Sequence, residues 1–340
     1  MAPPFLFSDS LKEVLTGARS TELKAYCISH RKDVDGLGSG AMAVAATGGK
    51  IILSDYDDFV DNLRKVPDDA DRLVITDLAA DSADFDLYLD EVKRIARHAD
   101  VTHIDHHHMS PSAKSKVRKA GVRLVHDVTE CASMLTYKTF KASLPERARL
   151  IALCGAVTDY MDDSPMGKKL MEQGDRQFVL LEATLLAEAL GRKGSDEEFP
   201  EMVVEELSRM KHPHEIKGVP EAAIEQLRIE AKLGEIVKVQ GKKLGHLAYM
   251  VTEEHSTGNV AKLLIGAFEV PVGVAMKEKQ GGWYEVSLRS TSENSTHLGT
   301  TIGKIALHLG GSGGGHQRAA GCRIPVGRAD EMLKALAARI

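Results

Sequence analysis

The stretch "ISHRKDVDGLGSG", residues 28–40, decides the fold and raises the question of function. An apolar run at 24–29 predicts a strand, and the small residues after position 35 predict a helix that packs closely on a sheet. Between the two lie one imidazole and two carboxylates, those of His30, Asp33 and Asp35. The segment could be a solvated turn, a glycine-rich dinucleotide-binding turn, or half of a metal site.

The first half of the chain alternates between short apolar runs and segments with a helical pattern. The apolar runs lie at 24–29, 50–54, 72–76, 100–104 and 122–126, and the helical segments at 36–47, 83–98 and 131–142. This alternation predicts an α/β fold with a doubly wound, mainly parallel sheet and helices on both faces. In such sheets ligands bind beyond the carboxyl ends of the strands.

The second half predicts a helical connector followed by a smaller α/β domain. Polar segments with Gly and Pro flank helical patterns near 199–210 and 220–239. Strands are then expected near 243–251, 271–277, 283–289 and 319–324, and helices near 297–309 and 328–339, with a glycine-rich loop before the last strand. We therefore expect an N-terminal domain over 1–190, a connector over 191–240 and a C-terminal domain over 241–340.

Composition limits the possible partners. A net charge of -5 argues against coating long nucleic acid, and 5% aromatic residues argue against extended base stacking. The four cysteines form no CxxC pair, and Cys27 and Cys154, which lie in apolar runs, are expected to be buried apolar residues. The N-terminal "MAPPFLFSDS" does not resemble a signal peptide, and no apolar run is long enough to span a bilayer, so we expect a cytoplasmic protein without a membrane partner.

Acidic and imidazole side chains follow several apolar runs at the expected carboxyl edge of the sheet. They are His30, Asp33 and Asp35 after the first run, Asp77 after the third, Asp105, His106, His107 and His108 after the fourth, and Asp159 after the run at 150–157. Without a cation, repulsion and desolvation would cost on the order of several kcal/mol. Oxygen and nitrogen ligands without thiolate suit Mn²⁺ or Mg²⁺, and their number indicates two ions.

Each feature alone has an ordinary explanation. A single aspartate after a strand, such as Asp77 or Asp159, is usually a helix N-cap, and a histidine triplet is often only surface. The segment "GLGSGA" at 36–41, with Asp55 downstream, also imitates a dinucleotide-binding fingerprint. However, "HRKDVD" separates these glycines from the strand, and its acids would repel a pyrophosphate. The joint occurrence of the polar residues favours the metal site.

In order, these residues resemble the four motifs of the DHH phosphoesterase superfamily. The matching residues are His30, Asp33, Asp35, Asp77, the DHH triplet at 105–107 and Asp159. Farther on, "GGGHQRAAG" at 313–321 resembles the glycine-rich signature of the DHH-associated C-terminal domain, so the resemblance covers essentially the whole chain. It implies hydrolysis of phosphodiester or phosphoanhydride bonds with two divalent cations, Mn²⁺ first, with Mg²⁺ or Co²⁺ as alternatives.

The resemblance also implies a role for each motif residue. One ion would be held by His30, Asp33 and Asp77, and the other by Asp35, Asp77, His106 and Asp159, with Asp77 bridging. Asp105 would orient a histidine, and His107 would lie beside the phosphate as hydrogen-bond donor or general acid. His108 would be peripheral. Many relatives have one more residue between the first histidine and the first aspartate.

The C-terminal candidates belong to the substrate end. Glycines let backbone N–H groups approach a phosphate or a base, although a flexible turn is the simpler explanation of "GGSGGG" alone. The resemblance favours substrate binding by Arg289, Gly313, Gly314, Gly315, His316 and Arg318, with His255 and Asn259 as weaker candidates.

The chain is shorter than RecJ-like exonucleases, which carry an additional nucleic-acid-binding domain. We therefore expect a phosphodiesterase for short RNA or for linear or cyclic dinucleotides that releases nucleoside 5′-monophosphates. Alternatives are a 3′-phosphoadenosine 5′-phosphate phosphatase, an exopolyphosphatase or pyrophosphatase, and a nucleotide sensor without catalysis. A homodimer is compatible with the sequence.

Overall fold

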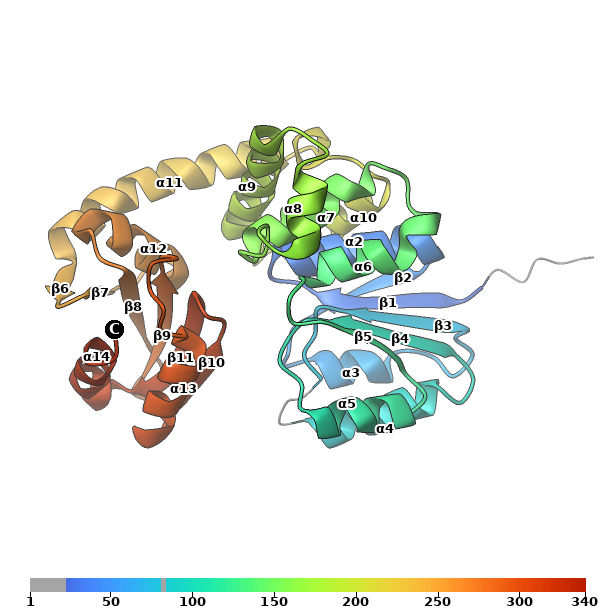
Figure 1. Cartoon of the computed structure of the whole chain (residues 1–340), viewed down its shortest axis with the longest axis horizontal. Helices are drawn as coiled ribbons and strands as arrows, with labels where there is room; N and C mark the ends of the chain where they lie inside the picture. The colour runs from blue at the N-terminus through green and yellow to red at the C-terminus, as the bar shows by residue number, and fades with distance from the viewer. Residues whose placement is uncertain (1–22, 81–83) are drawn as a thin grey trace, which may run out of the picture. The chain divides into compact units, whose positions relative to one another are not determined.

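The computed structural model describes residues 23–80 and 84–340, so the N-terminal "MAPPFLFSDS" lies outside the described residues (Figure 1). The chain divides into two compact units, the first ending at Glu225 and the second beginning at Gln226. No helix in the described part of the chain combines the length and the apolarity needed to cross a bilayer.

Unit 1 contains the expected parallel sheet. Its strands are β1 (Ala25–His30), β2 (Lys50–Ser54), β3 (Arg72–Thr76), β4 (Asp100–Asp105) and β5 (Arg123–His126), in the spatial order β2-β1-β3-β4-β5. All four pairings are parallel. The doubly wound α/β fold predicted from the alternating pattern is therefore confirmed, and β3 lies between β1 and β4.

Helices cover both faces of this sheet (Figure 1). On one side lie α3 (Phe59–Arg64), α4 (Phe85–Ile95) and α5 (Pro111–Lys119). On the other lie α2 (Val34–Thr47), α6 (Ala132–Phe140), α7 (Ala148–Thr158), α9 (Arg176–Lys193) and α10 (Glu198–Ser208), with α8 (Pro165–Met171) beyond them. Side chains of neighbouring strand residues point to opposite faces of the sheet. In β3, for example, Ile75 packs in the core on the side of α3, α4 and α5, and Val74 packs in the core on the side of α2 and α6.

The sequence pattern missed or misjudged five of the described helices. Helices α3, α5, α8 and α9 were not expected, and the apolar run at 150–157 forms α7 instead of ending as a strand. Helix α7 packs against α2, α6 and α9, so most of its side chains are buried. A helix that is apolar all round has no amphipathic period and cannot be told from a buried strand by periodicity.

Glycines of α2 allow this helix to lie directly on β1. A Cβ at Gly36 would come 2.3 Å from the carbonyl oxygen of His30, and one at Gly40 would come 2.7 Å from the Cβ of Ser29. The Ser29 hydroxyl, in turn, donates to the carbonyl of Gly36 at 2.5 Å. The small residues at the end of the opening stretch thus serve helix–sheet packing, as expected, and do not form a dinucleotide-binding turn.

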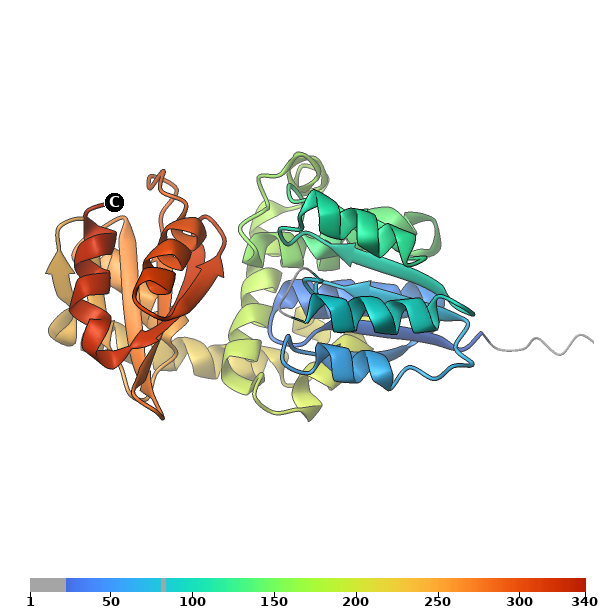
Figure 2. The ribbon, with the colours of Figure 1, turned by 90° about the horizontal axis from the view of Figure 1, so that it is seen from below.

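Unit 2 is built on a mixed sheet of six strands in the order β10-β11-β9-β8-β7-β6. The strands are β6 (Lys242–Leu244), β7 (Leu247–Val251), β8 (Val272–Lys279), β9 (Trp283–Ser290), β10 (Ser312–Gly315) and β11 (Ala319–Pro325). Only β7 and β8 pair in parallel. Helices α13 (Leu298–His308) and α14 (Ala329–Ala337) pack on one face, as Figure 2 shows, whereas α12 (Thr257–Phe268) and the end of α11 (Val219–Gln240) pack on the other.

The glycine-rich segment before β11 is a strand and not the expected loop. Residues Ser312–Gly315 form the edge strand β10, antiparallel to β11. Helix α13 lies against this strand, since a Cβ at Gly299 would come 1.9 Å from the carbonyl oxygen of Gly315. Glycine is poor in intrinsic strand propensity, so sequence pattern alone favoured a loop. Tertiary packing instead requires a strand without side chains here.

Two glycine substitutions should have opposite effects on stability. Gly40→Ala places a methyl group into Ser29 and should lower the unfolding free energy of unit 1 by about 1–3 kcal/mol. Gly266→Ala, in α12, meets nothing within 4 Å and should raise the unfolding free energy of unit 2 by about 0.5–1 kcal/mol. Calorimetric unfolding of both variants measures the two shifts, and a stabilising Gly40→Ala would contradict the close packing of α2 on β1.

Candidate metal centre

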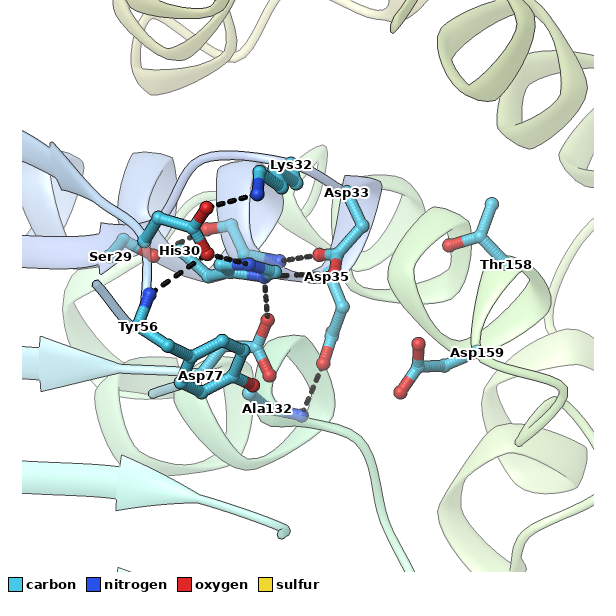
Figure 3. Close-up of polar contacts among 12 residues, drawn as sticks. Ser29, His30, Lys32, Asp33, Asp35, Tyr56, Asp77, Ala132, Thr158 and Asp159 are labelled. Carbon is cyan, nitrogen blue, oxygen red and sulfur yellow. Dashed lines mark hydrogen bonds and ion pairs between the residues drawn. The ribbon is translucent and has the colours of Figure 1, made fainter. Parts of the chain in front are cut away.

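The expected metal ligands of unit 1 gather at the carboxyl ends of β1, β3 and β4 (Figure 3). Parallel pairing puts these ends at the same edge, and the order β1-β3-β4 makes the three strands neighbours. In each of three groups, one ligand atom per residue lies within 4.8 Å of the others. The groups are His30–Asp33–Asp77, Asp35–His106–Asp159 and Asp77–His106–His107.

The first group is formed where β1 turns into α2. Asp33 is the N-cap of α2, and its Oδ1 accepts a hydrogen bond from the backbone N–H of Gly36 at 2.8 Å. Its other oxygen, Oδ2, lies 2.9 Å from Nδ1 of His30. The short spacing between His30 and Asp33 thus still brings both side chains together.

Asp77 lies between the first two groups. Its Oδ2 is 3.6 Å from Nδ1 of His30, and its Oδ1 is 3.3 Å from Nε2 of His106. The residue is buried and adopts a φ of 57°, a left-handed conformation that is uncommon for a residue with a side chain. One carboxylate therefore presents an oxygen to each group, which is the geometry that a bridging ligand needs.

The second group joins three elements. Asp35, in the first turn of α2, accepts hydrogen bonds at 2.8 Å from the backbone N–H groups of Ala132 and Ser133 at the start of α6. Nε2 of His106 lies 3.8 Å from Oδ2 of Asp35 and 3.3 Å from Oδ2 of Asp159. Asp159 reaches this group from the C-terminus of α7 and not from a strand end, as the sequence had suggested.

The charged side chains of the three groups shift one another's pKa values. Burial disfavours the charged form of His30, but the neighbouring Asp33, then Asp55 and Asp77, raise its pKa to about 12. Burial likewise opposes charge on His106, yet Asp77, Asp35 and Asp159 raise its pKa to about 10.

The carboxylates respond in two ways. Burial and the charge of Asp77 raise the pKa of Asp35 to about 6, and burial with the charge of Asp35 raises the pKa of Asp159 well above its usual range. Burial also acts on Asp77, but hydrogen bonding to His106 and His30 holds its pKa below its usual range. Protons therefore balance the charge in this arrangement, and a cation could replace them.

The donor set fits divalent metal ions. The nitrogens of His30 are buried, and neither makes a well-directed hydrogen bond, although Nδ1 faces the carboxylates of Asp33 and Asp77. Imidazole nitrogens and carboxylate oxygens suit Mn²⁺ and related ions. Asp55 lies behind the ring, with its Oδ1 3.7 Å from Nε2 of His30, as a carboxylate that orients a metal-binding histidine would.

The other two residues of the DHH triplet form a hydrogen-bonded chain. Nδ1 of His107 donates to Oδ1 of Asp105 at 2.8 Å, and Nε2 of His107 lies 3.1 Å from the hydroxyl oxygen of Tyr56. Asp105 is fully buried, His107 is partly buried and His108 is exposed. Sequence reasoning missed Tyr56, whose only signal was an aromatic residue just after the second strand.

The C-terminal candidates come together at one end of the sheet in unit 2. Arg289, near the end of β9, pairs with Ala319 at the start of β11, and the backbone N–H of Ser290 donates to the carbonyl of Arg318 at 2.9 Å. His316 is exposed at the β10–β11 turn. The guanidinium of Arg289 lies 3.1 Å from where a Cβ of Gly258 would be, against the first turn of α12, which also carries Asn259. His255 precedes this helix and is partly buried.

A family model of the DHHA1 domain matches residues 242–340. These residues are a DHHA1 domain. The expectation of a DHH-associated C-terminal domain is thereby confirmed, and it applies to the whole of the sheet that carries Arg289 and His316. Comparison of the sequence with curated proteins gives no match.

Several solved structures share the fold of this chain at low sequence identity. The pGpG-specific phosphodiesterase PggH from Vibrio cholerae is 17% identical with a TM-score of 0.58, and the match covers 93% of this chain and 98% of that one. RecJ with Mn²⁺ from Thermus thermophilus is 16% identical with a TM-score of 0.59, and the match covers 97% of this chain and 54% of that one. For an exopolyphosphatase-related protein from Bacteroides fragilis the corresponding values are 14% and 0.51, covering 97% and 95%. The chain therefore shares its fold with these proteins, and its residues 242–340 match the DHHA1 domain.

Metal binding should release protons. At pH 7 the raised pKa values of His30 and His106 keep both rings protonated in the metal-free protein, and a ligand must lose its proton to bind a metal. The affinity for Mn²⁺ should therefore rise between pH 6 and pH 8, by about tenfold per pH unit for each proton released. Calorimetric titration with Mn²⁺ in two buffers of different ionisation enthalpy counts these protons. Equal heats in both buffers would contradict the prediction, and His30→Ala should reduce the number released.

Proposed function

We propose that the protein is a two-metal phosphodiesterase that hydrolyses short oligonucleotides or dinucleotides to nucleoside 5′-monophosphates. The observation that carries the proposal is the position of Asp77, whose two oxygens face two separate ligand groups. A shared carboxylate is what a pair of closely spaced cations requires, and such pairs are typical of enzymes that cleave phosphate esters.

We propose a separate set of ligands for each of the two ions. His30, Asp33 and Asp77 would hold one, and Asp35, Asp77, His106 and Asp159 would hold the other. When bound, two divalent cations supply Lewis acidity at the phosphoryl oxygens and lower the pKa of water. Mn²⁺ is the first choice because the ligands mix imidazole with carboxylate, and Mg²⁺ or Co²⁺ would fit similar sites.

Protein side chains would orient the substrate. Asp105 accepts the hydrogen on Nδ1 of His107, which fixes the tautomer and the orientation of that ring. His107 would then lie beside the scissile phosphate as hydrogen-bond donor or general acid. In unit 2, the positive charges of Arg289 and Arg318, with His316, would bind a part of the substrate remote from the scissile bond. The backbone of Gly313, Gly314 and Gly315 would approach the substrate closely. Gly313 and Gly315 also serve packing, because a Cβ at either position would clash with β11.

The comparisons support a short substrate. One structure of the same fold, matched over 98% of its length, is described as specific for the linear dinucleotide pGpG. A sensor without catalysis is disfavoured, because every position of the expected metal set carries a competent ligand.

Loss of Asp77 should abolish activity and reduce metal binding together. With Mn²⁺ and a linear dinucleotide, we expect the intact protein to release 5′-mononucleotide, and Asp77→Asn to lower kcat by at least about a thousandfold and to bind fewer than two ions. Asp90→Asn, an exposed carboxylate on α4, is the control. Product analysis and metal titration give the two readouts. Normal turnover of Asp77→Asn with two ions bound would eliminate the bridging role.

Substrate range should distinguish the proposed activity from its alternatives. A panel of linear and cyclic dinucleotides, short RNAs, 3′-phosphoadenosine 5′-phosphate, pyrophosphate and polyphosphate should show hydrolysis of the dinucleotides or short RNAs. If the protein instead released orthophosphate from the bisphosphate or from polyphosphate and left the dinucleotides and RNAs intact, it would be a phosphatase and not a phosphodiesterase.

Removal of the Arg289 side chain should weaken substrate binding and leave metal binding unchanged. We expect Arg289→Ala to raise KM for a dinucleotide about tenfold or more, because it removes a charge-assisted contact with phosphate, and to leave Mn²⁺ binding unchanged. Arg323→Ala, which removes an arginine stacked on Trp283 in the same sheet, is the matched control. An unchanged KM in Arg289→Ala would show that this end of the sheet does not bind substrate.

A further inference from the structure

His107 is held at both of its ring nitrogens and at its backbone. Asp105 accepts the hydrogen on Nδ1, and Nε2 lies 3.1 Å from the hydroxyl oxygen of Tyr56, which donates to the neutral ring and accepts from the protonated ring. Nε2 of His126, at the end of β5, lies 2.6 Å from the carbonyl oxygen of His107, to which it donates. Asp105 is two residues from His107 in sequence, whereas Tyr56 lies 51 residues away.

Tyr56 is itself fixed in place by a turn that follows β2. The hydroxyl of Ser54 and the backbone N–H of Asp55 donate to Oδ1 of Asp58 at 2.8 Å and 2.7 Å. The side-chain amide of Asn62, in α3, donates to the hydroxyl of Ser54 at 2.9 Å. This network ties the turn to α3, so the direction in which the Tyr56 side chain leaves the backbone is set in advance.

The Tyr56 ring extends from the edge strand β2 across the metal centre to the β4 loop. Its centroid lies 5.3 Å from that of His30 and 6.1 Å from that of His107, edge-on to the latter at 85°. Figure 3 shows the ring beside Asp77. The residue nevertheless keeps 42% of its surface exposed, so it is not a core aromatic whose purpose is to fill space.

We infer that Tyr56 is a positioning residue for His107. Its hydroxyl and the Asp105 carboxylate hold opposite sides of one imidazole, so the ring cannot rotate or tilt without breaking a hydrogen bond. A side chain that must meet a phosphate in one orientation gains rate from such restraint. The catalytic consequence of this role rests on the proposed function, because that function gives His107 its part in the reaction. The contact between Tyr56 and His107 does not depend on the proposed function.

A different role makes opposite predictions. If Tyr56 only covered His107 and had to leave before substrate could bind, removal of its hydroxyl would raise the rate or lower KM. If Tyr56 bound substrate independently of His107, the effects of changing the two residues would add.

A double-mutant cycle tests the inference. With a dinucleotide and Mn²⁺, Tyr56→Phe should lower kcat about tenfold with KM within about twofold, the value of one hydrogen bond lost in the transition state. In a His107→Ala background, Tyr56→Phe should have no further effect, because the residue through which it acts is gone. Tyr26→Phe removes a hydroxyl from β1 and should match the unsubstituted protein. Unchanged or increased kcat in Tyr56→Phe, or an additive loss in the double variant, would overturn the inference.

Two further readouts separate this inference from the proposed function. Metal titration should give the same number of Mn²⁺ ions in Tyr56→Phe as in the unsubstituted protein, and a lower number would assign Tyr56 to the metal site instead. NMR of nitrogen-labelled histidine side chains, with the His107 signal identified from His107→Ala, should show a shift at Nε2 of His107 in Tyr56→Phe and none in Tyr26→Phe. If the unsubstituted protein cleaves no phosphodiester, the proposed function fails. The NMR comparison still decides whether Tyr56 holds His107, and an unmoved Nε2 signal would overturn that contact.

Discussion

The concentration of negative charge at one edge of a parallel sheet is the constraint on which the rest of unit 1 depends. Asp35 and Asp77 are buried, and Nε2 of His106 lies within 4 Å of a carboxylate oxygen of each of them and of Asp159. Buried carboxylates repel one another and lose hydration, so a fold can hold them only if other charges compensate. The histidines of β1 and β4 provide part of that compensation, and two cations would provide the remainder.

Backbone N–H groups hold two of the carboxylates at this edge in place, those of Asp33 and Asp35. The N-terminus of α6 donates two hydrogen bonds to Asp35, and the first turn of α2 donates one to Asp33. Helix N-termini favour negative charge, so both interactions lower the cost of burying these groups. Gly155 of α7 keeps space for the first contact, since a Cβ there would lie 2.6 Å from Oδ1 of Asp35. The ligand groups are thus preorganised by the protein alone.

In unit 2, as in unit 1, glycines allow a helix to pack closely on a strand. Its glycines let α13 lie against the backbone of the edge strand β10, and this places His316 at the adjoining turn. The arginines at positions 289 and 318 reach the same end of the sheet from neighbouring strands. The glycine-rich signature of the DHHA1 domain therefore has a packing explanation in this chain, and the basic side chains around it are the better candidates for contact with an anionic substrate.

The sequence by itself determined the strands of unit 1, their parallel arrangement and the set of residues at the candidate metal centre. It could do so because an apolar run followed by a charged residue is a local pattern, and parallel topology brings all such strand ends to one edge. Tertiary structure decided what no local pattern encodes. Burial on all sides made 148–158 a helix, and packing against α13 made Ser312–Gly315 a strand. The contact between Tyr56 and His107 depends on the order of the strands in space, because the two residues are 51 positions apart and only the assembled sheet brings them within 3.1 Å.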